Sequence, residues 1–159
     1  MGAFMSAISQ TLSHFSLLEK IGQGGMGEVY LANDTTLDCK VALRFLPVTF
    51  IGEPERMARF EREVKLPASL NHPNIAGIYG VDQADGNRFL VLEYAEGETL
   101  QARLSKGALP LEDALALCCQ IAEGLEAAHE RGVIHRDLKF ANVMITTEEL
   151  QKLVPKEGR

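Results

Sequence analysis

The chain has 159 residues, of which 46% are hydrophobic and 24% are charged, and its net charge is −6. This length suits one domain or two small lobes, with enough apolar residues to bury a core. The acidic balance and the lack of a Lys/Arg cluster exclude nucleic acid as an expected partner.

The N-terminal part of the chain predicts a loose leader followed by strands. Residues 1–14 are small, polar and unpatterned, and the first strand is expected over residues 15–21. Apolar residues alternate in two further segments, 28–32 and 40–46, which are separated by turn residues at 33–36. These segments predict antiparallel strands joined by short turns.

Residues 54–70 have the apolar spacing of a helix. The apolar stripe consists of Met57, Phe60 and Val64. Pro67 lacks an amide proton, and its ring clashes with the carbonyl of Glu63, which costs ~3 kcal/mol inside a helix. We therefore expect this helix to kink or stop near Leu66.

A second hairpin is predicted after this helix. Residues 71–74 form a turn, and strands are expected over residues 75–82 and 88–94, joined at residues 85–87. The N-terminal part of the chain therefore contains five expected strands and one helix.

Two helices are expected next. Residues 99–104 predict a short helix, and a longer helix begins at Pro110 and ends at Gly132, which acts as its C-terminal cap. The longer helix carries one continuous apolar stripe. The stripe consists of Leu111, Ala114, Leu115, Cys118, Ile121, Ala122, Leu125 and Ala128.

Residues 22–29 contain a glycine motif, G-x-G-x-x-G-x-V. Its glycines are Gly22, Gly24 and Gly27. A dinucleotide site would need a helix directly after the glycines, whereas here Val29 continues into a strand. Glycines between two strands let backbone amides approach phosphate oxygens without a Cβ in the way. An ordinary glycine-rich hairpin is the alternative.

The strongest motif is the run from His135 to Asn142, His-Arg-Asp-Leu-Lys-Phe-Ala-Asn, which follows the long helix. The alternative interpretation of this run is a solvated charged loop. In this position the run resembles the catalytic loop of a protein kinase. With the glycine motif, the chain is similar to bacterial-type serine/threonine protein kinases over about residues 15–146.

The resemblance implies roles for three residues of this loop. Asp137 would orient a substrate hydroxyl and accept its proton, and Lys139 would neutralise the transferred phosphate. Asn142 would be a ligand of Mg²⁺. Phe140 replaces the proline that is common at its position.

The resemblance also implies an ATP site. The residues that would line it are Gly22, Gly24, Gly27, Val29 and Ala42. Arg44 stands where the family has lysine, and a forked guanidinium is not a conservative replacement for a compact ammonium. Arg44 would form a compromised ion pair with Glu63.

The segment around residues 89–97 resembles the kinase hinge. By this resemblance Leu92 is the gatekeeper, and the Glu93 carbonyl and the Ala95 amide contact the adenine edge. Any buried edge strand that ends in glycine would look similar.

The implied fold is α+β and protein-kinase-like, with a five-stranded antiparallel N-lobe containing one helix. The first helices and the catalytic loop of an incomplete α-helical C-lobe follow. The expected divisions are a flexible leader at 1–14, the N-lobe and hinge at 15–95, a partial C-lobe at 96–146 and a divergent tail at 147–159.

Kinase catalysis also uses the aspartate of an Asp-Phe-Gly turn to hold Mg²⁺, and no aspartate follows Asp137. Instead, residues 147–154 predict a short helix, with Thr146 and Glu149 spaced as a capping box. We therefore expect a kinase domain truncated before Asp-Phe-Gly, with weakened binding of ATP and Mg²⁺. As an isolated chain it would be a weak or inactive enzyme.

Three functional interpretations remain open from the sequence. The chain could be one piece of an active kinase assembly, a non-catalytic pseudokinase scaffold that binds partners through its exposed long helix, or a fragment without a role. The expected partners are a protein substrate or a partner protein.

The sequence also predicts a compartment. The three cysteines, Cys39, Cys118 and Cys119, lack metal-site or redox spacing, which is typical of a reduced, cytoplasmic chain. No apolar run reaches the ~18 residues that a membrane helix needs.

Overall fold

The computed structural model describes residues 10–24, 27–146 and 151–153. It divides into two compact units, and each is described by itself. The first unit contains the described residues up to Met57 together with Tyr79–Tyr94, and the second contains Ala58–Ile78 and the described residues from Ala95 onward.

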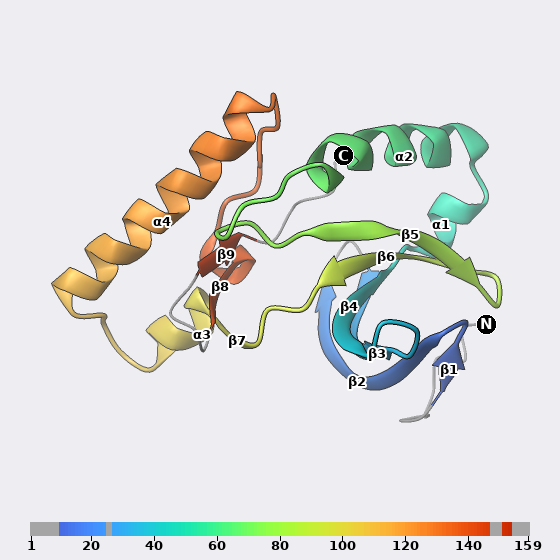
Figure 1. The fold of residues 1–159 in the computed structure, drawn as a ribbon, viewed down its shortest axis with the longest axis horizontal. Helices are drawn as coiled ribbons and strands as arrows, with labels where there is room; N and C mark the ends of the chain where they lie inside the picture. Colours follow the sequence, from blue (N-terminus) through green and yellow to red (C-terminus); the bar gives the residue numbers. More distant parts are fainter. Residues whose placement is uncertain (1–9, 25–26, 147–150, 154–159) are drawn as a thin grey trace. The chain divides into compact units, whose positions relative to one another are not determined.

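The first unit is built on a six-stranded sheet with the order β1-β2-β3-β4-β6-β5 (Figure 1). The strands are β1 (Thr11–Leu12), β2 (Phe15–Gly24), β3 (Gly27–Asp34), β4 (Cys39–Phe45), β5 (Ile78–Ala84) and β6 (Asn87–Glu93). The five strands predicted from alternation are confirmed. The sixth, β1, lies inside the segment expected to be a loose leader, where it pairs antiparallel with β2.

The two faces of this sheet carry different side chains. Residues paired across strands point to the same face, and successive residues of a strand point to opposite faces. One face buries an apolar cluster, onto which Tyr30 also packs. The cluster consists of Leu12, Phe15, Leu17, Ala32, Val41, Leu43, Phe45, Phe89 and Val91.

Two helices follow β4 in sequence. The short helix α1 (Val48–Ile51) was not predicted, and the longer helix α2 (Pro54–Ala68) was. A kink or a stop was expected near Leu66, and α2 ends two residues later, at Ala68, with Pro67 inside it. Pro67 lies next to the last helical residue, so its missing amide removes one hydrogen bond at the end of the helix. The backbone amides of Ser69 and Leu70 then close the turn by donating to the Leu66 and Pro67 carbonyls.

The second unit combines helices with a three-stranded sheet of order β7-β8-β9. Its strands are β7 (Gly97–Thr99), β8 (Val143–Thr146) and β9 (Gln151–Leu153). Its helices, besides the larger part of α2, are α3 (Leu100–Ser105), α4 (Leu111–Glu130) and the 3-10 helix η1 (Phe140–Asn142). Both predicted helices in this region are confirmed.

The prediction of a helix over residues 147–154 is wrong for residues 151–153, which are the part that the structure describes. Gln151–Leu153 forms strand β9, which pairs antiparallel with β8. The predicted capping box needs Glu149, which lies outside the described residues. Pairing with β8 gives β9 a partner for its backbone amides and carbonyls, and this tertiary gain outweighs a local helical pattern.

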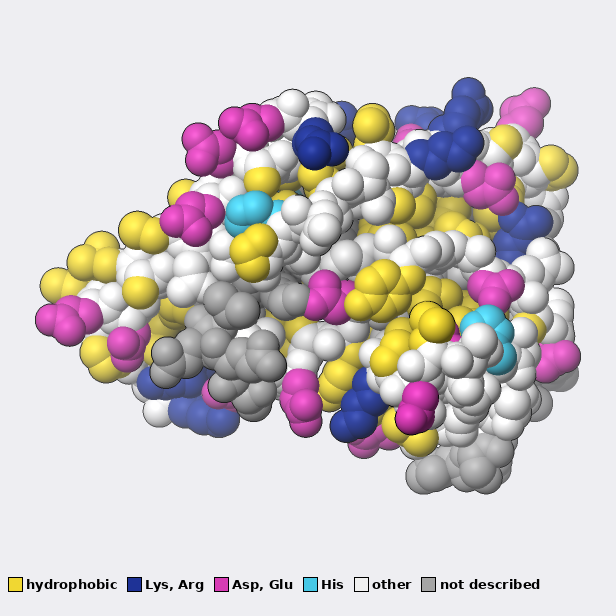
Figure 2. Space-filling model, in the orientation of Figure 1, with side chains coloured by type: hydrophobic (Ala, Val, Ile, Leu, Met, Phe, Trp, Pro, Cys, Tyr) yellow, Lys and Arg dark blue, Asp and Glu magenta, His cyan; other side chains and the backbone are white. Residues whose placement is uncertain are grey.

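Helix α4 buries only part of its apolar stripe. Ile121 and Leu125 of the stripe pack around the buried pair Leu100 and Val143, together with Leu117, which was not assigned to the stripe. The other part of the stripe reaches the surface, where Figure 2 shows hydrophobic side chains along α4. These exposed residues are Leu111, Leu115, Cys118 and Ala122.

The predicted C-terminal cap of α4 is confirmed. Gly132 has a φ of 75°. The Gly132 amide donates to the His129 carbonyl and the Val133 amide donates to the Ala128 carbonyl, which is the Schellman arrangement. This cap turns the chain out of α4 toward residues 135–142. Within the described residues, no helix is both long enough and apolar enough to cross a membrane.

Candidate functional site

The glycine motif lies between two paired strands, as predicted. Gly22 pairs with Val29, and Gly24 pairs with Gly27 at the described end of the hairpin. Gly27 has a φ of +107°, and a Cβ built on it would lie 1.9 Å from the Phe45 carbonyl oxygen. Gly27 is therefore required by its own backbone conformation and by the close approach of β4.

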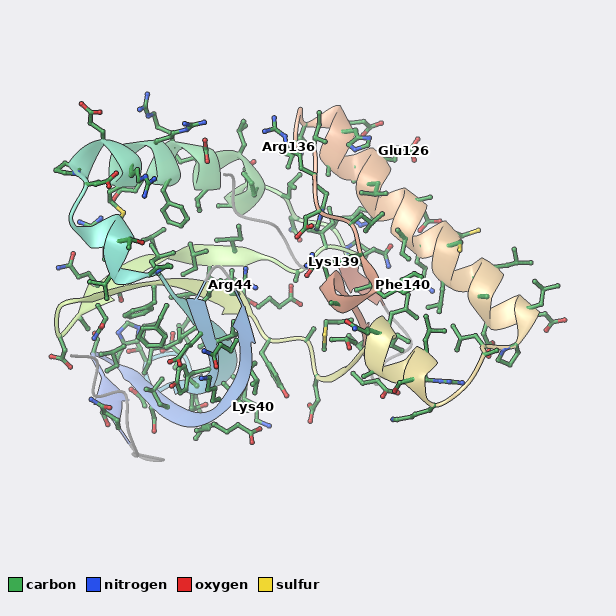
Figure 3. All side chains as sticks on the ribbon, turned by 180° about the vertical axis from the view of Figure 1, so that it is seen from behind. Lys40, Arg44, Glu126, Arg136, Lys139 and Phe140 are labelled. Atoms are coloured by element: carbon green, nitrogen blue, oxygen red, sulfur yellow. The ribbon has the colours of Figure 1, made fainter. Side chains whose placement is uncertain are left out.

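Four of the predicted nucleotide residues share one face of the sheet in the first unit. Ala42 pairs with Leu92, and Arg44 pairs with Val29 on one side of β4. Ala42 and Arg44 are two residues apart on β4, so their side chains point to the same face of the sheet, and so do those of their partners Leu92 and Val29. The structure brings these four residues together on the face opposite the apolar cluster. The pairing with Val29 places Arg44 beside the glycine hairpin. Figure 3 shows Lys40 at the other end of β4.

Ala42 and Leu92 are 7% and 5% exposed. Small and aliphatic side chains of this kind are typical of residues that pack against the face of a purine ring. The arrangement therefore fits the base of a nucleotide, with Arg44 as the nearby cation.

The remaining predicted nucleotide residues belong partly to the other unit. Glu93 ends β6 in the first unit, whereas Ala95 and Glu63 belong to the second. Glu63 accepts a hydrogen bond from Arg59 Nε at 2.8 Å, within α2. The ion pair between Arg44 and Glu63, and the shared hinge role of Glu93 and Ala95, stay predictions.

In the second unit, the structure brings together the three predicted catalytic-loop residues. Asn142 Nδ2 donates to the Asp137 carbonyl oxygen at 2.8 Å and to Asp137 Oδ2 at 3.3 Å. Lys139 Nζ lies 3.7 Å from the same carboxylate oxygen. One amide and one ammonium therefore orient the Asp137 carboxylate, whose side chain is 33% exposed.

His135 contributes to this geometry, and sequence reasoning gave it no role of its own. The Asp137 amide donates to His135 Nδ1 at 3.3 Å, across Arg136, which has a φ of 61°. A non-glycine residue in this left-handed region is uncommon and is often found at functional sites. Figure 3 shows Arg136 near the end of α4, whereas Lys139 lies at the start of η1 and Phe140 is its first residue.

The loop is anchored at its C-terminal end by the core of the second unit. The backbone amide of Asn142 donates to the Lys139 carbonyl at 2.9 Å, which closes η1. Val143 follows directly, is 2% exposed and starts β8. The position of Asn142 is therefore fixed by a buried neighbour, while Phe140 is 59% exposed and leaves the loop surface open.

The described residues do not fit Mg²⁺ as well as they fit a nucleotide. They contain no group of three or more His, Cys, Asp or Glu side chains placed to hold a metal ion. Because Asn142 Nδ2 is used by Asp137, its amide oxygen remains to face a cation. One neutral oxygen beside one carboxylate falls short of the oxygen cage that a hard divalent cation prefers.

Comparison with known proteins agrees with the geometry. The family model described as "Protein kinase domain" matches residues 15–154. The serine/threonine-protein kinase pkn2 of Myxococcus xanthus is 41% identical over 132 residues, which are 83% of this chain and 16% of that protein. The serine/threonine-protein kinase PrkC of Bacillus subtilis is 39% identical over 132 residues, 82% of this chain and 20% of that protein.

Among solved structures, the PknI kinase domain of Mycobacterium tuberculosis superimposes with a TM-score of 0.80 at 28% identity. This match covers 95% of the present chain and 61% of the PknI chain. The chain therefore spans about a fifth or less of these two curated relatives and under two thirds of a crystallised kinase domain.

Proposed function

The chain belongs to the protein kinase family, and from this membership we propose that it is a nucleotide-binding module of the serine/threonine kinase type. We propose further that the isolated polypeptide of 159 residues transfers phosphate weakly or not at all. Protein serine or threonine hydroxyls would be the acceptors of any transfer.

The observation that carries the proposal is the group of Asp137, Lys139 and Asn142, in which Asn142 is hydrogen-bonded to Asp137 and Lys139 forms an ion pair with it. Phosphoryl transfer depends on positioning and electrostatic stabilisation more than on covalent chemistry by the protein. Asp137 accepts the proton of the substrate hydroxyl, and Lys139 offsets negative charge on the phosphate. Asn142 holds Asp137 in place through its amide nitrogen.

Two features support weak activity. No aspartate follows Asp137 in these 159 residues, so they do not contain the Asp-Phe-Gly aspartate that the family uses, together with the catalytic-loop asparagine, to hold Mg²⁺. Arg44 carries a planar guanidinium where a compact ammonium is needed between the nucleotide phosphates and a helix glutamate. Mg²⁺ would neutralise phosphate charge when bound.

Autophosphorylation of the purified chain with labelled Mg-ATP tests this proposal, with Asp137→Asn as the control. We expect the signal of the parent chain to lie at the level of the control. Transfer that exceeds the control by an order of magnitude or more would refute the inactive interpretation and establish an active kinase.

The second candidate is a scaffold that uses α4 rather than the nucleotide face. It is favoured by Leu111 and Leu115, which are 74% and 57% exposed on one side of that helix. Titration with the fluorescent analogue mant-ATP separates the two candidates. Ala42→Trp would place a large ring where the base is expected to pack. Saturable binding that this variant abolishes supports the nucleotide module, whereas no binding by the parent chain supports the scaffold.

A further inference from the structure

A network of four polar side chains spans the two strands that carry the glycine motif. Lys20 Nζ donates to Glu28 Oε1 at 2.6 Å and to Gln23 Oε1 at 2.9 Å. The Tyr30 hydroxyl donates to Glu28 Oε2 at 3.0 Å. Lys20 and Gln23 lie on β2, and Glu28 and Tyr30 lie on β3, so the network crosses the hairpin.

A β-bulge makes this network possible. The pairing of β2 with β3 shifts register between Lys20 and Gly22, so that Lys20 pairs with Tyr30 and Gln23 pairs with Glu28. In a regular strand, residues 20 and 23 would point to opposite faces. The extra residue of the bulge, Ile21, brings both side chains to one face.

These positions also carry the side chains that can fix the glycine hairpin. Cross-strand side-chain pairs stabilise a sheet and specify its register. Gly24 and Gly27 pair with each other without side chains, and Gly22 offers none to Val29. From Lys20 to the described end of the hairpin, the two pairs with a side chain on both strands are those of the network.

The network is connected to the buried core on the face opposite Val29. The Tyr30 ring packs edge-on against the Phe45 ring, with centroids 5.5 Å apart and an interplanar angle of 83°. The carbonyl of Phe45 is the group that approaches Gly27. The backbone of the core residue Phe45 therefore lies close to Gly27. The Phe45 ring is also linked to Glu28, next to Gly27, through Tyr30.

The electrostatics of the network favour charged Glu28. The hydrogen bond from Lys20 holds the pKa of Glu28 below its usual value, against an opposing effect of burial. Burial, and then the hydrogen bond to Glu28, raises the pKa of Tyr30. Lys20 is therefore paired with a carboxylate, and Tyr30 remains a donor, over the whole neutral pH range.

We propose that Lys20, Gln23, Glu28 and Tyr30 form a cross-strand brace that fixes the pairing of β2 with β3 at Gly22, Gly24 and Gly27 and thereby sets the affinity for a nucleoside triphosphate. This inference rests on the proposed nucleotide binding. The four side chains lie on the face away from Val29 and Ala42, so they are positioning residues that act through the backbone of Gly22, Gly24 and Gly27.

The test uses three conservative variants of the full chain and one matched control. Lys20→Met keeps the aliphatic stem and removes the ammonium, Glu28→Gln removes the charge, and Tyr30→Phe keeps the ring but removes the hydroxyl. The control is Lys40→Met, at an exposed position on β4 that pairs with Asn33.

The first readout is amide hydrogen exchange of the peptide covering residues 18–30 without nucleotide. We expect Lys20→Met and Glu28→Gln to exchange about two- to fivefold faster there, as the loss of a partly exposed ion pair implies, with Lys40→Met unchanged. Tyr30→Phe should lie between the parent and Glu28→Gln. Equal exchange in parent and variants would refute the brace.

The second readout is the Kd for mant-ATP. Lys20→Met and Glu28→Gln should each raise it by about two- to fivefold, and the effect should shrink at high salt. The double variant Lys20→Glu with Glu28→Lys should restore most of the affinity, because it restores the ion pair in reverse. A purely local loss of packing would not be rescued in this way.

The outcomes separate the two proposals. Faster exchange with an unchanged Kd would overturn the link between the brace and affinity. If the parent chain does not bind mant-ATP, the proposed nucleotide binding is wrong and the affinity claim falls with it. Hydrogen exchange then still decides whether the brace fixes the pairing of β2 with β3.

Discussion

Replacing Gly27 with alanine should be the most damaging single-atom change in the glycine motif. The new Cβ would lie 1.9 Å from the Phe45 carbonyl oxygen, and real Cβ contacts almost never fall below 3.0 Å. The backbone of β4 would have to retreat by more than 1 Å at a residue that is only 7% exposed. The positive φ adds strain of about 1–2 kcal/mol for any residue with a side chain.

Two other glycines of the same unit separate the contributions. Gly86 has a φ of +76° and no atom within 4 Å of a built Cβ, so Gly86→Ala measures backbone strain alone. Gly22 has its nearest neighbour, the Val29 Cβ, at 3.7 Å, which is ordinary contact. We expect Gly22→Ala to change the free energy of unfolding by less than about 0.5 kcal/mol.

Urea unfolding followed by far-UV circular dichroism measures these differences. Gly86→Ala should cost about 1–2 kcal/mol, and Gly27→Ala about 3 kcal/mol or more, since forced overpacking adds to the strain. With a slope of about 2 kcal/mol per molar urea, the Gly27 variant should lose about 1.5 M in its midpoint. If Gly27→Ala unfolds at the same urea concentration as Gly86→Ala, the close approach of Phe45 does not constrain this position.

Three further predictions concern the sheet, a helix cap and an ion pair. Gly97→Ala would place a Cβ 1.9 Å from the Ile145 carbonyl oxygen, so amides of β8 should exchange faster; unchanged exchange would contradict the close pairing of β7 and β8. Thr99 caps α3 by accepting from the Ala102 amide at 3.0 Å, so Thr99→Ala should cost about 1 kcal/mol in thermal unfolding. Thr99→Ser should be nearly neutral, and equal losses would argue against the cap. Because the folded-state pKa of Glu28 is lowered, its stabilisation is present above the ordinary value of 4.5 and is lost as the pH falls below it. The stability difference between the parent and Glu28→Gln should therefore shrink in acid, and a constant difference would refute the assignment.

The sequence was sufficient for elements whose signals are local. The strands β3 and β4 follow from alternating apolar residues, and the end of α4 follows from Gly132, whose conformation needs no distant partner. The same holds for the composition of the catalytic loop, because the spacing of Asp137, Lys139 and Asn142 is itself the motif.

Local signals failed where strand pairing decides the outcome. The helical pattern near residues 151–153 gave way to strand β9, because β8 offers backbone hydrogen bonds that an isolated short helix cannot match. Pro67 lies inside the last turn of α2, which ends at Ala68, two residues beyond the end expected near Leu66.

The sequence by itself determined the family, the order of the strands along the chain and the chemical groups available, because each depends only on residue types and on their short spacings. Only the tertiary structure decided that Asn142 holds Asp137 and that the carbonyl of Phe45 requires Gly27 to be glycine. It also decided that Lys20 meets Glu28. The physical reason is that these contacts depend on a bulge, a close backbone approach and a buried anchor, which arise from strand pairing and packing in the folded chain and not from the residue types of one segment.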